Sequence, residues 1–183
     1  NAMKAYQEAL KIFTAENYPE VFADIQHHLG IIYSEIPDDV KKKNVWAGIS
    51  VYSFLEALNF YNKVDYPYQF GMICNNFGNA YTQYPAAIHS DNFEKALAWY
   101  REALDVRTAG QYPEERSATL LNYVEACWHV AHIESQEKLY ADMIEKLNEV
   151  KTLTTNADLL TKAEEHLLQL HQLKSLGTDK EVV

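Results

Sequence analysis

Glycine, proline and cysteine are all scarce in this sequence. Its 183 residues include 6 glycines, 5 prolines and 2 cysteines. A turn-rich β-sandwich or barrel uses many glycines and prolines at its turns, so this composition favours long helices. Cys74 and Cys127 form no paired motif and lie among apolar residues. We therefore expect buried, reduced thiols in a cytoplasmic protein.

Basic charge and long apolar runs are missing as well. The formal net charge is -10 at pH 7, which disfavours nucleic acids and anionic membranes as partners. No apolar run approaches the roughly 18 residues that span a bilayer, and no basic, apolar leader opens the chain. The sequence has no Gly-rich phosphate loop, no His-Glu-x-x-His motif and no nucleophile elbow. We expect no catalytic activity and no cofactor.

The sequence does contain an internal repeat. The dipeptide Tyr-Pro occurs at 18–19, 66–67 and 112–113, in steps of 48 and 46 residues. A second pattern, an aromatic residue followed by x-Glu-Ala-Leu, also occurs three times. Its alanines, Ala9, Ala57 and Ala103, are separated by the same steps of 48 and 46 residues. Because one register holds at several landmarks, the chain is interpreted as repeated units of one plan.

Each unit is expected to form two helices. Apolar residues from Phe22 to Tyr33 follow helical spacing, and proline fits only the first turn of a helix, so each Tyr-Pro marks a helix start. The predicted helices cover residues 19–36, 45–64, 67–84, 91–108, 113–132, 135–153 and 157–176. Asp91 is the expected N-cap of one of them, with Glu94 completing a capping box. Residues 38–44 are predicted to be a polar loop in which Lys41, Lys42 and Lys43 are solvated.

Two glycines mark expected close contacts between helices. Gly30 and Gly78 occupy the same position in successive first helices. Helix axes approach within about 8 Å only where the side chains at the crossing are small. We predict a close crossing at each glycine, with Tyr33 or Tyr81 filling the adjacent space.

The segments Leu29-Gly30-x-x-Tyr33, Phe77-Gly78-x-x-Tyr81 and Ala96-x-x-x-Tyr100-x-x-Ala103 resemble the tetratricopeptide repeat (TPR) pattern. The resemblance implies an all-α fold, an α-α superhelix in which antiparallel helix pairs form a solenoid. The units are longer than the usual 34 or so residues, and this long form is similar to TPR arrays of bacterial signalling proteins.

The expected organisation follows from the repeat. Residues 1–3 are interpreted as a cloning remnant, and the half-unit after them suggests a piece of a longer array. The repeat domain is predicted to cover residues 4–176. Its parts are a partial unit at 4–18, three units at 19–65, 66–111 and 112–153, and a final helix at 157–176. Residues 177–183 are expected to be a polar tail beyond the domain.

In the family that the chain resembles, the first helix of each pair lines a concave groove. If this arrangement applies to the present chain, each of its three first helices contributes residues to the groove. They are Asp24, His27, His28, Ile31 and Glu35 from the first, Met72, Asn75, Asn76, Asn79 and Gln83 from the second, and Leu121, Asn122, Glu125, Trp128 and His129 from the third. This set has no Lys or Arg, which argues against a clamp for a peptide carboxylate.

Side-chain amides dominate the predicted site. An amide offers both a donor and an acceptor, so a row of asparagines can hold an extended peptide backbone. The alternative is that these asparagines belong only to the repeat consensus. The predicted partner-binding residues are Asn75, Asn76, Asn79, Asn122, His27, Glu125, Trp128 and His129.

The histidines allow further interpretations. Glu125, His129 and His132 share one helical face and could ligate a metal, but a surface or packing cluster is the preferred interpretation. His27 and His28 could titrate near neutral pH and make binding pH-sensitive. His166 and His171 are expected to be solvated.

Three functions remain open from the sequence. The leading hypothesis is a non-catalytic scaffold that binds a neutral or basic protein or peptide segment. The alternatives are a peptide-sensing regulatory domain of a larger bacterial signalling protein, and a structural array that self-assembles into a homo-oligomer through the ends of the solenoid.

Overall fold

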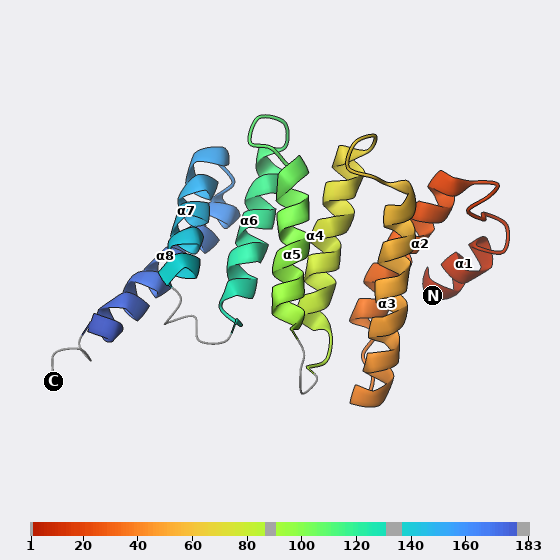
Figure 1. Ribbon diagram of the computed structural model, residues 1–183, viewed down its shortest axis with the longest axis horizontal. Helices are drawn as coiled ribbons and strands as arrows, with labels where there is room; N and C mark the ends of the chain where they lie inside the picture. The colour runs from red at the N-terminus through yellow and green to blue at the C-terminus, as the bar shows by residue number, and fades with distance from the viewer. Residues whose placement is uncertain (1, 87–90, 131–136, 179–183) are drawn as a thin grey trace. The chain divides into compact units, whose positions relative to one another are not determined.

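The computed structural model describes residues 2–86, 91–130 and 137–178, with side chains as far as Lys174. These residues form helices and no strand, which confirms the predicted all-α class (Figure 1). The helices are α1 (Ala2–Ala9), α2 (Pro19–Glu35), α3 (Val40–Phe60), α4 (Pro67–Gln83), α5 (Asn92–Val106), α6 (Pro113–Cys127), α7 (Glu137–Leu153) and α8 (Ala157–Thr178). In the described part of the chain, no helix is long and apolar enough to cross a membrane.

The chain divides into two compact units. The first, residues 1–106, contains α1 to α5, and the second, residues 107–183, contains α6 to α8. In the first unit α2 packs against α3 and α4 against α5, while α2 also contacts α4. In the second unit α6 packs against α7, and α8 contacts both. Within each unit the first helices touch their own partners, and α2 touches α4 as α6 touches α8, which is the packing of a helical repeat.

The three Tyr-Pro junctions share one backbone path. Tyr18, Tyr66 and Tyr112 precede their helices with φ of -142°, -133° and -137° and ψ of 65°, 55° and 57°. The backbone N–H of each tyrosine donates to the carbonyl four residues earlier, at 2.9, 3.1 and 3.0 Å. The proline that follows occupies the first helical position, where its missing N–H costs nothing. The prediction that each Tyr-Pro starts a helix is confirmed.

The start of α3 differs from the prediction. The segment expected to be a loop, residues 38–44, is helical from Val40 onward. Asp39 caps the helix by accepting a hydrogen bond from the Lys42 backbone N–H at 3.1 Å. The Asp38 carboxylate accepts from Lys42 Nζ at 3.2 Å and from Trp46 Nε1 at 3.4 Å. The predicted loop was wrong because an aspartate cap turns the lysine run into the first turns of a helix, where the lysines remain exposed.

The predicted close crossings are confirmed inside both helix pairs of the first unit. A Cβ added at Gly30 would lie 2.9 Å from the Phe54 ring, and one at Gly78 would lie 2.4 Å from the Tyr100 ring. Phe54 and Tyr100 are equivalent residues of successive second helices. Each ring thus fills a notch that only glycine leaves open.

The core of the first unit is aromatic. Phe54 stacks on Phe77 with ring centroids 4.7 Å apart, and Phe77 stacks on Trp99 at 4.5 Å. Met3 of α1 packs with Leu10 and Phe13 against a second cluster that contains Tyr33. The segment set aside as a cloning remnant therefore includes a residue that takes part in packing.

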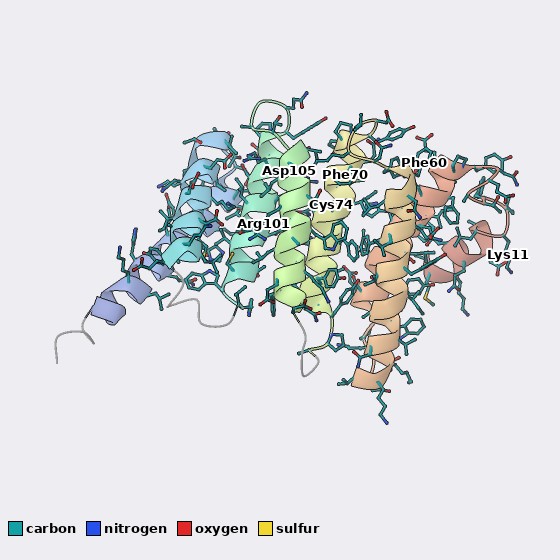
Figure 2. The ribbon with its side chains drawn as sticks, in the orientation of Figure 1. Lys11, Phe60, Phe70, Cys74, Arg101 and Asp105 are labelled. Atoms are coloured by element: carbon teal, nitrogen blue, oxygen red, sulfur yellow. The ribbon has the colours of Figure 1, made fainter. Side chains whose placement is uncertain are left out.

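The two cysteines and the start of α5 agree with expectation. Cys74 (Figure 2) and Cys127 are buried and form no disulfide bond. The Asp91 carbonyl accepts a hydrogen bond from the Lys95 backbone N–H at 2.9 Å, which places Asp91 directly before the first turn of α5. The helix that starts at Pro113 ends at Cys127, earlier than the predicted end at residue 132, and residues 131 and 132 lie outside the described part of the chain.

Candidate functional site

In the first unit, α2 and α4 present repeat-equivalent side chains that share a burial pattern. His27 and Asn75 are equivalent, and only 4% and 9% of their surfaces are exposed. The other predicted groove positions are half-buried or exposed: Asp24, His28, Ile31 and Glu35 on α2, and Met72, Asn76, Asn79 and Gln83 on α4. Two predicted site residues, His27 and Asn75, are thus turned into the packing and do not form the open face.

A hydrogen bond joins the two helices at this face. Asn76 Nδ2 lies 3.0 Å from His27 Nε2, and the amide donates to the ring nitrogen. His27 is therefore a neutral imidazole with its proton on Nδ1. Burial, and secondarily the neighbouring His28, lower the pKa of His27 to about 4, while Asp24 opposes the shift. The interpretation that His27 could titrate near neutral pH is not supported, because its hydrogen bond from Asn76 requires the uncharged ring.

A second hydrogen bond anchors the next asparagine on α4. The Tyr100 hydroxyl of α5 donates to Asn79 Oδ1 at 2.8 Å. Asn76 and Asn79 lie three residues apart, about 4.5 Å along the helix. Among the residues with described positions, neither Asn76 Oδ1 nor Asn79 Nδ2 has a hydrogen-bond partner. The two anchors leave one acceptor and one donor at adjacent turns of α4, both on half-buried residues.

Asp24 adds a negative charge to the same face. The Tyr61 hydroxyl at the end of α3 donates to Asp24 Oδ1 at 2.6 Å. Burial, and secondarily this carboxylate, raise the pKa of Tyr61 above its ordinary value. His28 lies one turn further along α2, where its Nδ1–H donates to the Asp24 carbonyl at 2.7 Å and its ring stacks on Tyr6.

The remaining predicted site residues lie on α6 or directly after it, in the second unit. Asn122 and Trp128 are half-buried, while Glu125 and His129 are exposed. Trp128 Nε1 donates to His166 Nδ1 of α8 at 3.0 Å, and the two rings stack with centroids 6.3 Å apart. The indole N–H of Trp128 is therefore already satisfied by a residue of the same unit.

His166 was wrongly expected to be solvated. It is half-buried, and burial lowers its pKa. A signal was present in the sequence: Ala163 and Leu170 lie three residues before and four after it, and both are fully buried. His166 lies on the same packed face of α8, whereas His171 is exposed as predicted.

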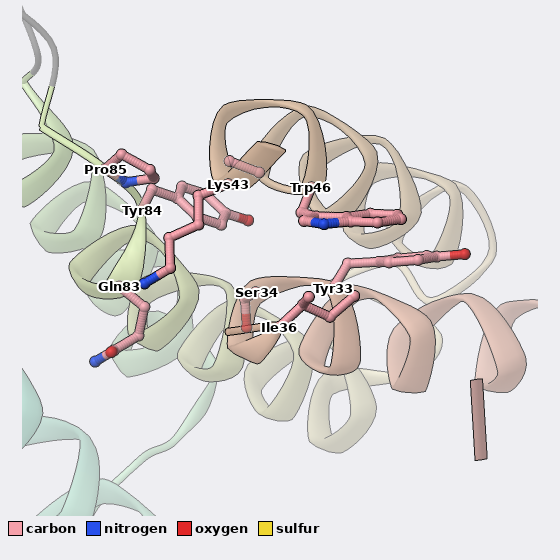
Figure 3. A pocket seen from close by; sticks show the side chains of 9 residues that line it. Tyr33, Ser34, Ile36, Lys43, Trp46, Gln83, Tyr84 and Pro85 are labelled. Carbon is pink, nitrogen blue, oxygen red and sulfur yellow. The ribbon is translucent and has the colours of Figure 1, made fainter. Parts of the chain in front are cut away.

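One hollow in the first unit is too small for a ligand. It lies where the ends of α2 and α4 meet the start of α3, beside the Tyr33 ring stacked on Trp46 at 5.7 Å (Figure 3). Its volume is about 10 Å³, room for about one water molecule. The Tyr84 hydroxyl at its wall donates to Ser50 Oγ at 2.8 Å, and Ser50 donates to the Gly30 carbonyl at 2.6 Å. This hollow therefore has no room for a ligand.

No metal site is formed by the described side chains. Across residues 2–86, 91–130 and 137–174, no three His, Cys, Asp or Glu residues converge on a point that could hold a metal ion. His132, the third residue of the metal interpretation with Glu125 and His129, lies outside the described residues.

Comparison with protein-family models, curated proteins and solved structures finds no match for this chain. The features that characterise its architecture are therefore internal ones. They are the three equivalent Tyr-Pro junctions, the two ring-filled glycine notches and the shared burial pattern of α2 and α4.

Proposed function

We propose that this protein is a non-catalytic, TPR-like binding module that holds an extended protein or peptide segment against its first helices. Repeated helix pairs with a free side on each first helix are suited to this role, because a segment laid across them meets an equivalent position at each repeat. The hollow beside Trp46 is too small to enclose a small molecule.

The observation that carries the proposal is the pair of anchored amides on α4. His27 holds Asn76 by its Nδ2, and Tyr100 holds Asn79 by its Oδ1. The groups that remain, Asn76 Oδ1 and Asn79 Nδ2, match the N–H and C=O that an extended backbone presents. Because both side chains are already fixed, a partner would lose little side-chain entropy on forming these bonds.

Charge favours a neutral or basic partner. Asp24 and Glu35 are exposed on α2, and the chain carries a net charge of -10. Lys and Arg are absent from the proposed contact positions on α2 and α4. A basic segment would be attracted to this face, whereas an acidic one would be repelled.

The second unit offers a smaller set of contacts of the same kind. Glu125 and His129 are exposed on and just after α6, and Asn122 is half-buried beside them. We assign to these three residues a contact surface of the second unit by itself. Trp128 contributes its ring surface, since its N–H is engaged by His166.

The test is selection of short neutral and basic peptides from a displayed library, followed by affinity measurement on variants. Asn79→Asp keeps the oxygen that accepts from Tyr100 and removes the Nδ2 donor. It should weaken binding about tenfold, the value of one hydrogen bond. Asn148→Asp is the matched control, because it adds the same charge at an exposed position of α7.

The results separate the proposal from its alternatives. Loss of affinity in Asn79→Asp, with binding retained in Asn148→Asp, supports the α4 face. Equal affinities for both variants would place the contact elsewhere and overturn the proposal. Failure to select any peptide would also count against it.

A further inference from the structure

The outer side of α3 exposes a row of apolar side chains. Val45, Tyr52 and Leu55 keep 60%, 59% and 44% of their surfaces exposed. With Gly48 between them they follow a 3-4-3 spacing, which places all four on one line along the helix. We call these four residues the α3 stripe. The opposite side of the helix is buried through Ser50, Phe54 and Ala57.

The repeat itself does not require an apolar stripe. The equivalent positions on α5, 46 residues later, are Asp91, Glu94, Ala98 and Arg101. All four are exposed, and Figure 2 labels Arg101 on this helix. Both helices are the second members of their pairs, yet only α3 is apolar on its outer side. A contact specific to α3 explains the difference better than the fold does.

Packing within the described chain does not require a glycine at position 48. A Cβ added there would meet nothing within 4 Å, unlike one at Gly30 or Gly78. Glycine in a helix interior costs about 1 kcal/mol relative to alanine. Gly48 therefore leaves an empty notch in the middle of α3, one turn away from the exposed ring of Tyr52.

We propose that the α3 stripe joins two copies of this chain, with Tyr52 of each copy entering the notch at Gly48 of the other. The stripe is self-complementary in the antiparallel direction. About a midpoint at residue 50, Gly48 lies opposite Tyr52 of the second copy, and Val45 lies opposite Leu55. In a dimer with a two-fold axis, the Gly48–Tyr52 contact and the Val45–Leu55 contact each occur twice, as in any isologous interface. The chain already packs rings into glycine notches at Gly30 and Gly78.

Charge supports the same direction of packing. Lys41 is exposed at the start of α3, where Lys42 is already paired with Asp38 and Asp39, and Glu56 lies near the end of the helix. Antiparallel packing brings Lys41 of one copy towards Glu56 of the other, whereas parallel packing would bring the two Lys41 side chains together. Opposite charges beside an apolar seam select orientation.

The interface is small, so the dimer is weak and reversible. The stripe spans eleven residues, a rise of about 15 Å along the helix, and its apolar contacts come from three side chains. Stable complexes bury about 800 Å² per partner, more than such a patch supplies. Association is expected only at high protein concentration.

Sedimentation equilibrium over a wide concentration range tests the proposal. The unaltered chain should shift towards twice the monomer mass, and Tyr52→Glu with Leu55→Glu should remain monomeric. Val64→Glu is the matched control, since Val64 is 86% exposed and lies outside the stripe. Gly48→Ala should weaken association about tenfold while making the monomer more stable, a combination that a purely structural glycine would not produce.

Cysteine cross-linking tests the direction. A mixture of the Val45→Cys and Leu55→Cys variants should form a disulfide-linked pair, because these positions face each other across the two-fold axis. Val45→Cys alone should not cross-link, since its two copies would lie about 15 Å apart.

Three results would overturn the proposal. They are a monomer at every concentration, association that survives Tyr52→Glu with Leu55→Glu, and efficient cross-linking of Val45→Cys alone. The proposal is independent of peptide binding at α4. The stripe variants should bind selected peptides normally, so the two can fail separately.

Discussion

The two units hold their helix pairs together with different chemistry. In the first unit, the rings of Phe54 and Tyr100 enter the notches at Gly30 and Gly78. In the second unit, Val124 occupies the position equivalent to these glycines, and Lys146 occupies the position equivalent to the two rings. The pair α6–α7 buries aliphatic side chains, among them Leu120, Met143 and Leu147, and it is also joined by Arg116 Nε to Glu149 Oε1 at 2.5 Å. Thr154, directly after α7, donates from Oγ1 to Glu114 Oε1 at 2.6 Å.

A buried arginine reinforces the polar character of the second unit. Arg107 keeps 7% of its surface exposed and donates to Thr119 Oγ1 at 2.6 Å and to the Glu115 carbonyl at 3.2 Å. The same helix-pair plan is therefore compatible with a ring packed at a glycine, or with an aliphatic contact that has polar pairs beside it.

Removing a notch-filling ring should have the largest effect. Tyr100→Ala empties a fully packed site, so the free energy of unfolding should fall by about 3–5 kcal/mol in denaturant titrations. Tyr100→Phe is the control: it removes only the hydroxyl that binds Asn79 and should cost about 1 kcal/mol. A loss below 1 kcal/mol for Tyr100→Ala would show that the notch is not a main contact.

Acid should weaken the first unit through His27. Its pKa is about 4 in the folded protein and about 6.5 when unfolded, so the unfolded chain binds the proton first as pH falls. Stability should be constant above about pH 6.5 and should decline by about 3 kcal/mol down to pH 4.

The contribution of His27 is isolated by the difference between the unaltered chain and His27→Gln. Glutamine can still accept from Asn76 but binds no proton. The two pH profiles should diverge below about pH 6.5, and parallel profiles would contradict the buried neutral imidazole.

The glycine comparison is expected to give a smaller effect. Gly78→Ala places a Cβ 2.4 Å from the Tyr100 ring and should cost about 2 kcal/mol. Gly48→Ala meets nothing and should stabilise the monomer by up to about 1 kcal/mol. Thermal unfolding at low protein concentration compares them, and equal shifts would remove the distinction between filled and empty notches.

The ion pair of the second unit should give the smallest effect. Arg116 and Glu149 are half-buried, so a double-mutant cycle to alanine should yield a coupling of about 1 kcal/mol or less. Because salt screens the pair, the coupling should shrink at high ionic strength. The loss of stability caused by Gly78→Ala should not change with salt. If salt changed this loss and the Arg116–Glu149 coupling by the same amount, the proposed difference between the two units would be contradicted.

Much of the fold was predictable because its signals are local. Proline after tyrosine located the starts of α2, α4 and α6, and the glycine spacing located both close crossings. The start of α3 was missed because an aspartate cap before a lysine run resembles an ordinary polar loop. A cap becomes decisive only when the helix beyond it packs.

The candidate site was less predictable, because its contacts join distant parts of the chain. The periodicity places His27 and Asn76 on first helices, but their hydrogen bond spans 49 residues. His166, whose ring accepts the hydrogen bond from Trp128, lies 38 residues further along the chain. Its helix was predicted only from its apolar spacing, without a repeat motif. Helical spacing gives the face of a residue, and packing between helices decides whether its polar atoms point outward.

The side-chain amide signals of Asn76 and Asn79, followed by NMR while a selected neutral or basic peptide is added, test the binding proposal most directly. The Asn79 Nδ2 protons should shift strongly, because they would donate to the bound backbone. The Asn76 Nδ2 protons should change little, since His27 retains them. Saturation of the protein with peptide while the Asn79 signals stay unchanged would contradict the account.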